Sequence, residues 1–187
     1  LNGKPLIHYT IEALEKSECG NIFVSTDNDE IARVSKLRGA NIINRPDALS
    51  TDISKSEDAL IHACKLIDAD IIIFVQPTSP LVTSEDIDNG LMMMRYSDSV
   101  VSVYEEHWFP RWKDDATPHN WDPKNRPRRQ DVKPLYVENG AFYISKKSDI
   151  LKTGLRYSGN VGLLYMPFSR SFQLDTEDDL EILKKIL

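Results

Sequence analysis

The sequence has few cysteines, few glycines and no long apolar run among its 187 residues. Its two cysteines, Cys19 and Cys64, are too few for a disulfide framework, so we expect a protein of the reducing cytoplasm. No apolar run approaches the ~18 residues of a membrane span and no signal segment opens the chain, so we expect no membrane partner. Basic residues are outnumbered, 23 against 29 acidic ones for a net charge of −6, which argues against nucleic acid as the partner.

Several catalytic signatures are absent as well. No dinucleotide-binding glycine fingerprint occurs, no serine lies in a nucleophile-elbow context, and the four histidines show no metal-ligand spacing with the cysteines. These absences leave hydride transfer and covalent acyl transfer without support. The chain opens at Leu1-Asn2-Gly3 without a methionine, and we interpret this start as a cut end.

Helix-like and strand-like segments alternate over the first two-thirds of the chain. Apolar residues recur at helical spacing in four segments, and short apolar or β-branched runs lie between them. The predicted helices cover 5–16, 31–37, 56–66 and 84–96, the last capped by Ser84, and the predicted strands cover 21–26, 41–43, 70–75 and 99–103. This alternation predicts an α/β fold with a doubly wound, mostly parallel sheet, which binds ligands at the carboxyl ends of its strands.

The pattern breaks after Tyr104. Residues 107–134 hold three tryptophans and five prolines without a helical period, and a plain loop of more than about 12–15 residues is unusual. We therefore expect one domain over 1–187, with a lid or oligomerisation insertion at about 104–145. Beyond it we expect strands at 135–145 and 161–168, a short helix at 146–152 and a last helix from Thr176.

Two polar segments follow predicted strands. The turn over 76–81, Gln-Pro-Thr-Ser-Pro-Leu, comes directly after the most apolar strand; its place favours ligand contact, and the alternative is a stiff turn whose hydroxyls cap the next helix. Arg45-Pro46 ends another strand and is followed by a helix beginning near Ser56. An arginine beside free helix N–H groups suits an anionic or base-like ligand, and a surface arginine with an ordinary cap is an equally good interpretation.

Two further segments suggest anion or cation binding. Residues 126–131, Arg-Pro-Arg-Arg-Gln-Asp, are the one concentrated basic run, and with the polar strand that follows they favour a small carboxylate or phosphate ligand over a merely solvated face. Asp175 can hold Mg²⁺, which prefers carboxylates, water and substrate phosphates. From the residues alone a capping box of Thr176 and Asp179 is the better interpretation.

Together these segments resemble the N-acylneuraminate cytidylyltransferases and their relatives that act on other nine-carbon sugar acids. The resemblance spans nearly the whole chain. Its motifs, in order, are Val24-Ser25-Thr26-Asp27, Arg45-Pro46 with Asp52 and Ser56, the turn over 76–81, the run over 126–131 with Tyr136 and Glu138-Asn139-Gly140, and Leu174-Asp175-Thr176. It implies a Rossmann-like domain of the nucleotide-diphospho-sugar transferase type, with a dimerisation arm that reaches into the partner subunit of a homodimer.

The resemblance also implies roles for individual residues. It implies catalytic roles for Asp175 and Gln76, with Asp175 also the ligand of a Mg²⁺ cofactor. The nucleotide-binding residues it implies are Lys4, Arg45, Asp52 and Ser56. The sugar-acid-binding residues it implies are Gln76, Thr78, Ser79, Arg128, Arg129, Gln130, Tyr136 and Asn139. The implied reaction joins CMP from CTP to the anomeric oxygen of the sugar acid and releases pyrophosphate, a transfer that depends on positioning and charge neutralisation.

The sequence departs from the family pattern in two places. The family's triphosphate loop, rich in glycine, would lie just before Leu1, and we expect it there. Gln173 stands where many members have the first aspartate of an Asp-x-Asp pair, which leaves Asp175 as a single carboxylate. A sugar-nucleotide-binding protein with impaired catalysis is therefore an alternative, as is an enzyme for legionaminic, pseudaminic or Kdo-type acids; the absence of Gly-Asp-Glu-Pro after Val75 favours a nine-carbon acid.

Overall fold

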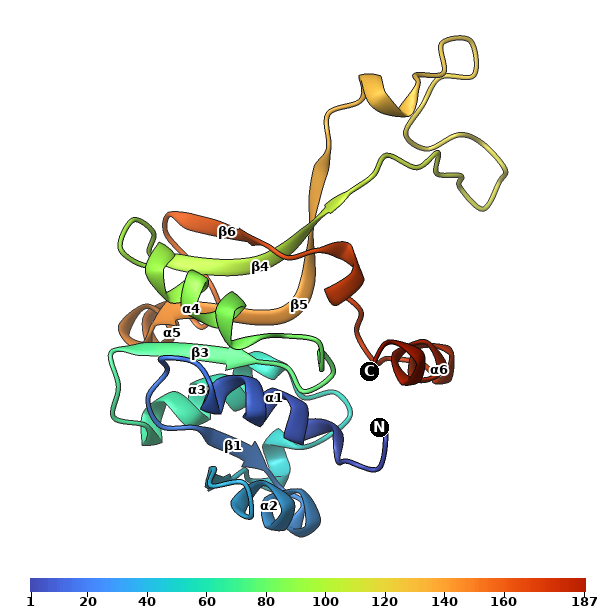
Figure 1. Ribbon diagram of the computed structural model, residues 1–187. Helices are drawn as coiled ribbons and strands as arrows, with labels where there is room; N and C mark the ends of the chain where they lie inside the picture. The colour runs from blue at the N-terminus through green and yellow to red at the C-terminus, as the bar shows by residue number, and fades with distance from the viewer.

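Helices and strands alternate along the chain in the computed structural model, which describes residues 1–187 (Figure 1). The α-helices are α1 (Leu6–Glu15), α2 (Asp29–Lys36), α3 (Ser56–Leu66), α4 (Ser84–Met93), α5 (Lys147–Thr153) and α6 (Glu177–Ile186). The strands are β1 (Phe23–Thr26), β2 (Asn41–Asn44), β3 (Ile71–Val75), β4 (Ser99–Glu106), β5 (Leu135–Lys146) and β6 (Val161–Tyr165). Short 3₁₀ turns are η1 (Asp47–Leu49), η2 (Arg129–Asp131) and η3 (Phe168–Arg170).

The strands form two sheets. β1 and β2 pair in parallel, and the other four strands lie in the order β3-β5-β4-β6. β4 pairs in parallel with β6, while β5 runs antiparallel to both β3 and β4. In the larger sheet β3, β4 and β6 thus point the same way and β5 alone is reversed, so the predicted α/β fold with a mostly parallel sheet is confirmed.

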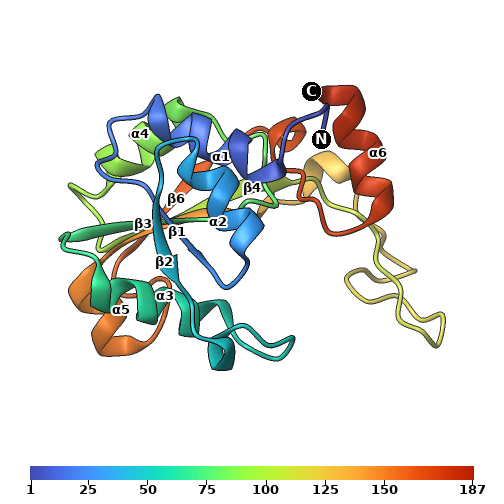
Figure 2. The same ribbon diagram turned by 90° about the horizontal axis from the view of Figure 1, so that it is seen from below.

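Helices cover both faces of the larger sheet (Figures 1 and 2). On one face Ile87 of α4 and Ala13 of α1 pack against Val100, Phe142 and other sheet residues. On the other face α3 and α5 pack with β3 around the fully buried Cys64. Successive residues of β3 point to opposite faces of the sheet: Ile73 packs in the cluster under α1 and α4, and Ile72 packs in the cluster under α3 and α5. Apolar residues on both faces are typical of a strand covered on two sides.

Helix ends follow the local sequence. Asn28 caps α2 by accepting from the Glu30 and Ile31 amides. The cap of α4 is Thr83, one residue before the predicted Ser84, because Thr83 forms a reciprocal capping box with Asp86. No helix is both long and apolar enough to cross a membrane.

Residues 107–134, here called the arm, extend away from the sheets at the end of a ribbon formed by β4 and β5 (Figure 1). The arm is held by its own contacts: the Trp112 and Trp121 rings meet edge to face at 5.4 Å, and the Arg126 guanidinium lies 4.8 Å from the Trp121 ring. Phe109 and Trp112 remain more than half exposed. The arm therefore has little apolar support from the rest of the chain.

Candidate active site

A cleft of about 290 Å³ opens beside β4 and β5, where the chain turns from β6 towards α6. Its lining residues are Tyr104, Glu138, Asn139, Phe168, Ser171, Phe172, Gln173, Asp175 and Asp179. Aromatic rings form one wall, with the Phe168 ring 5.3 Å from Tyr104 and 5.4 Å from Phe172. The charged lining residues are all acidic. An anionic ligand would therefore need a cation here, or basic groups from outside the cleft.

The turn after β3 lies next to this cleft. The Gln76 amide donates to the Ala141 carbonyl of β5 at 3.0 Å, and the Leu174 amide donates to the Thr78 carbonyl at 2.8 Å. These two backbone bonds fasten the turn to β5 and to the segment before α6. The carboxyl end of β3 thus meets the segment that carries Gln173 and Asp175.

Gly140 lets two side-chain amides converge. Its φ is +64°, in the left-handed region that favours glycine. A Cβ built there would lie 3.0 Å from Gln76 Oε1 and would clash with the Gln173 amide nitrogen. Both glutamine side chains therefore occupy the space over Gly140. The absence of a Cβ at Gly140 thus lets Gln76, a predicted site residue, lie close to Gln173, which stands where many family members have aspartate.

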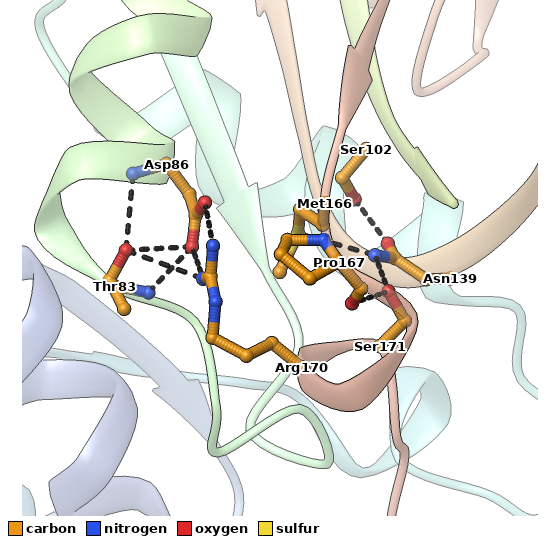
Figure 3. Close-up of polar contacts among 8 residues, drawn as sticks. All are labelled: Thr83, Asp86, Ser102, Asn139, Met166, Pro167, Arg170 and Ser171. Atoms are coloured by element: carbon orange, nitrogen blue, oxygen red, sulfur yellow. Dashed lines mark hydrogen bonds and ion pairs between the residues drawn. The ribbon is translucent and has the colours of Figure 1, made fainter. Parts of the chain in front are cut away.

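Asn139 is buried, and its side-chain amide is hydrogen-bonded to other residues of the chain (Figure 3). Its Oδ1 accepts from the Ser102 hydroxyl at 2.7 Å and its Nδ2 donates to the Ser171 hydroxyl at 3.1 Å. Ser102 lies where the β4–β5 register shifts, the kind of irregularity that often borders active sites. Asn139 thus fixes the cleft wall, and its amide is already occupied by partners within the chain.

Asp175 stands free at the start of α6. Thr176 and Asp179 form the expected capping box, and the hydrogen bond from Thr176 lowers the pKa of Asp179. The Asp175 carboxylate is exposed and accepts no hydrogen bond from the chain. No cluster of three or more His, Cys, Asp or Glu side chains could hold a metal ion, so any cation here would rest on this carboxylate, water and the ligand.

A partly buried ion pair joins Arg170 to Asp86 near the cleft without lining it (Figure 3). The Arg170 guanidinium of η3 donates two hydrogen bonds to the Asp86 carboxylate, one of them at 2.9 Å. Burial raises the pKa of Asp86, but the bonds from Arg170 and Thr83 outweigh it and hold the pKa below its usual 3.8. The pair therefore stabilises the fold above that pH, and its contribution is lost as the pH falls through the lowered pKa.

The predicted nucleotide-binding residues do not line the cleft. Arg45 donates to Asp27 and Ser50, each at 2.9 Å, and this contact lowers the pKa of Asp27. The Arg45–Asp27 contact joins the Val-Ser-Thr-Asp motif at the end of β1 to the Arg-Pro motif after the adjacent strand β2. The remaining three, Lys4, Asp52 and Ser56, are exposed.

The predicted sugar-acid residues are divided between the body and the arm. Thr78 and Asn139 lie at the cleft or its adjoining turn, and Ser79 is buried with no partner for its hydroxyl. The other predicted residues, Arg128, Arg129, Gln130 and Tyr136, lie outside the cleft. Arg128 pairs with Asp131 at 2.7 Å, the Arg129 guanidinium lies 5.7 Å from the Phe109 ring, and Gln130 is exposed. Tyr136 lies beside Tyr165, which raises the pKa of Tyr136.

Sequence reasoning missed the aromatic wall, Gly140 as a backbone requirement, and the Arg170–Asp86 pair. The Thr-x-x-Asp spacing at 83–86 signals the capping box, but nothing in the sequence joins it to an arginine 84 residues later. Phe168 ends a predicted strand and Phe172 follows it, so both could have been noted as candidate ligand contacts.

Two solved structures share this fold. The first, titled CMP:2-keto-3-deoxy-manno-octonic acid synthetase complexed with CTP, has a TM-score of 0.73 and 16% identity over 98% of this chain and 88% of that one. The second, 4-diphosphocytidyl-2C-methyl-D-erythritol synthase from Anaerococcus prevotii, has a TM-score of 0.75 and 12% identity over 100% and 87%. At these identities the two structures show a shared α/β fold.

Sequence comparison identifies the family. The cytidylyltransferase family model matches residues 1–180, so the chain belongs to the cytidylyltransferase family. N-acylneuraminate cytidylyltransferase B of Danio rerio is 33% identical over 96% of this chain and 44% of its own length. The N-acylneuraminate cytidylyltransferase of Streptococcus agalactiae serotype V is 32% identical over 96% and 46%. The chain thus spans less than half the length of these curated relatives.

Proposed function

We propose that this chain carries the catalytic domain of a CTP-dependent cytidylyltransferase that activates a nine-carbon sugar acid. The observation that carries the proposal is the convergence of Gln76 and Gln173 over Gly140, beside the free Asp175, in a chain that belongs to this family. The curated relatives, which are named for N-acylneuraminate, support the choice of substrate. The anomeric oxygen would attack the α-phosphorus of CTP and displace pyrophosphate.

The polar groups of the cleft suit positioning rather than covalent chemistry. The Gln76 and Gln173 amides offer both donors and acceptors to sugar hydroxyls or phosphate oxygens. The aromatic wall of Tyr104, Phe168 and Phe172 offers an apolar surface to a ring or an acyl group. Fixed contacts of this kind are what a transfer dominated by orientation and charge neutralisation needs.

We propose Mg²⁺ as the cofactor. The charged lining of the cleft is acidic, so it disfavours a triphosphate unless a cation or basic groups from outside the cleft offset the charge, and a cation is the simpler of the two. The free Asp175 carboxylate is the residue that would hold Mg²⁺, with water and phosphate oxygens completing the shell. When bound, the ion would neutralise charge on the triphosphate and help pyrophosphate to leave.

The arm is part of the proposal as well. Arg128, Arg129 and Gln130 lie away from the cleft of their own chain, and they would complete a sugar-acid site only across a homodimer. Arginine side chains suit the sugar carboxylate because they can donate two parallel hydrogen bonds to it.

Turnover by the full-length protein tests the proposal. Pyrophosphate release is measured with CTP, Mg²⁺ and N-acetylneuraminate, and then with legionaminic, pseudaminic and Kdo-type acids. Release with a nine-carbon acid supports the proposal, and preference for a Kdo-type acid corrects the substrate class. CTP or CMP-sugar binding without turnover of any acid would instead favour the impaired binding protein, which Gln173 in place of a carboxylate suggests.

A further inference from the structure

The Arg170–Asp86 ion pair joins two segments that both lead to the candidate site, α4 with the turn before it and η3 with the segment after it. Asp86 lies in the first turn of α4, which follows the turn that carries Gln76 and Thr78. Arg170 ends η3, which leads into the segment that carries Gln173 and Asp175. Neither charged group lines the cleft, so any effect on a ligand must pass through these two segments.

The pair is not needed to cap α4. The Asp86 carboxylate accepts from the Thr83 amide at 3.0 Å and the Thr83 hydroxyl oxygen accepts from the Asp86 amide at 3.3 Å, and these two bonds form the capping box. Arg170 adds a two-pronged contact to a residue that is only 6% exposed. Asp86 is buried and Arg170 is partly exposed, and such a pair is weak evidence for stability because desolvation offsets much of the Coulomb attraction. Its distinctive property is a fixed geometry between the two segments.

Two further contacts hold the same segment. The Ser171 hydroxyl accepts from Asn139 at 3.1 Å, and the Leu174 amide donates to the Thr78 carbonyl at 2.8 Å. Residues 170, 171 and 174 are thereby fixed to α4, β5 and the β3–α4 turn in succession. Phe172 and Gln173 lie between these anchors and line the cleft, and Asp175 follows the last of them.

We propose that Arg170 and Asp86 are positioning residues: their ion pair sets the place of the segment 171–175 against the Gln76 turn, and so aligns Gln173 and Asp175 for transfer. This inference rests on the proposed cytidylyltransferase function for its catalytic consequence. Its structural part, the ordering of residues 171–175 by the pair, stands independently of which ligand binds.

The test compares Arg170→Lys with a matched control in the full-length protein. Lysine keeps the charge but loses the planar fork. The control is Arg156→Lys, because Arg156 forms a similarly half-buried ion pair with Glu57, at 2.6 Å, and lies outside the candidate site. Deuterium uptake of peptides covering 167–176 and steady-state kinetics are measured on both variants and the wild type.

We expect Arg170→Lys to speed exchange at residues 171–175 about tenfold. We also expect it to lower kcat about 10- to 100-fold, with the KM for CTP changed less than about twofold. Arg156→Lys should change neither the exchange of this segment nor kcat. If Arg170→Lys cannot be purified, Arg170→Gln is compared with Arg156→Gln in the same way.

Unchanged exchange at 171–175 would overturn the proposal whatever the kinetics show. Faster exchange with kcat equal to that of Arg156→Lys would overturn the catalytic consequence and leave a purely structural pair. A wild-type protein that turns over no sugar acid refutes the proposed function instead, and the exchange experiment then decides the ordering role alone.

Discussion

The cleft and the arm are built in opposite ways. Around the cleft, Asn139, Arg170 and Leu174 make contacts that join segments far apart in sequence. In the arm, Arg126 meets a residue five positions away and Arg128 one three positions away. The comparison teaches that the cleft is preorganised by the fold of one chain, whereas the arm is ordered locally and presents exposed side chains to whatever it meets.

This difference sorts the candidate residues into two groups. Those at the cleft have their positions set before a ligand arrives, which lowers the entropy cost of binding. Those on the arm, Arg128, Arg129 and Gln130, are exposed and need a second surface to form a site. Substitutions in the two regions should therefore have different kinetic effects.

The largest effect is expected at Asp175. Asp175→Asn removes the charge that we propose holds Mg²⁺, and we expect kcat to fall about 100- to 1000-fold. Stability should change little, because the carboxylate is exposed and accepts no hydrogen bond from the chain. Pyrophosphate release at several Mg²⁺ concentrations, with a thermal melt, checks this expectation. Asp178→Asn, an exposed acid in the first turn of α6, is the control, and an equal loss in both variants would refute a specific role.

A smaller but still large effect is expected at Gly140. Gly140→Ala forces a left-handed backbone on alanine and pushes Gln173 off its place, so we expect kcat to fall about 100-fold. Gly154→Ala is the matched control, because Gly154 also has a positive φ, +72°. A Cβ added at Gly154 would lie 3.9 Å from its nearest neighbour, Ile61 Cδ1, which is an ordinary van der Waals contact. In both variants the left-handed backbone conformation of alanine lowers the free energy of unfolding by about 1 kcal/mol. Activity in Gly140→Ala equal to that of Gly154→Ala would show that the two glutamines are not needed there.

The arm should give a milder and more selective effect. We expect Arg129→Ala to raise the KM for the sugar acid about tenfold, with a smaller change for CTP, because it removes the charge-assisted contact that we propose Arg129 makes to the sugar carboxylate. Initial rates with each substrate varied in turn measure the two constants. Lys124→Ala, another exposed cation of the arm, serves as the control. A larger change in the KM for CTP would place Arg129 in the nucleotide site instead.

Much of the fold could be predicted from local patterns. The apolar run before Gln76 and the helical spacings on either side of it gave elements whose bounds differ from the structure by a few residues. The direction of β5 could not be predicted, because its alternation of residues is the same whether a strand runs parallel or antiparallel. Capping at Thr83 rather than Ser84 depends on which hydroxyl faces the Asp86 amide, and this distinction is too fine for the sequence pattern.

The site was predictable in its members more than in its arrangement. The place of Gln76 after a strand favoured ligand contact, whereas only the family resemblance implied a role for Asp175, for which the residues alone favoured a helix cap. The structure brings both residues close to the same cleft. The features near them that carry no motif of their own are the positive φ of Gly140 and the ion pair of Arg170 with Asp86. A positive φ and an ion pair across 84 residues are consequences of tertiary packing, so only the three-dimensional structure reveals them.

The most direct test of this account is the turnover of Gln76→Ala relative to the wild type, read beside its thermal melt. Because Gln76 reaches the site through its side chain, while its backbone bond to Ala141 is kept by any residue, activity and stability should separate. We expect kcat to fall about 100-fold while the melting temperature changes by less than about 4 °C. A large loss of melting temperature with normal turnover would show that Gln76 is structural and would contradict the account.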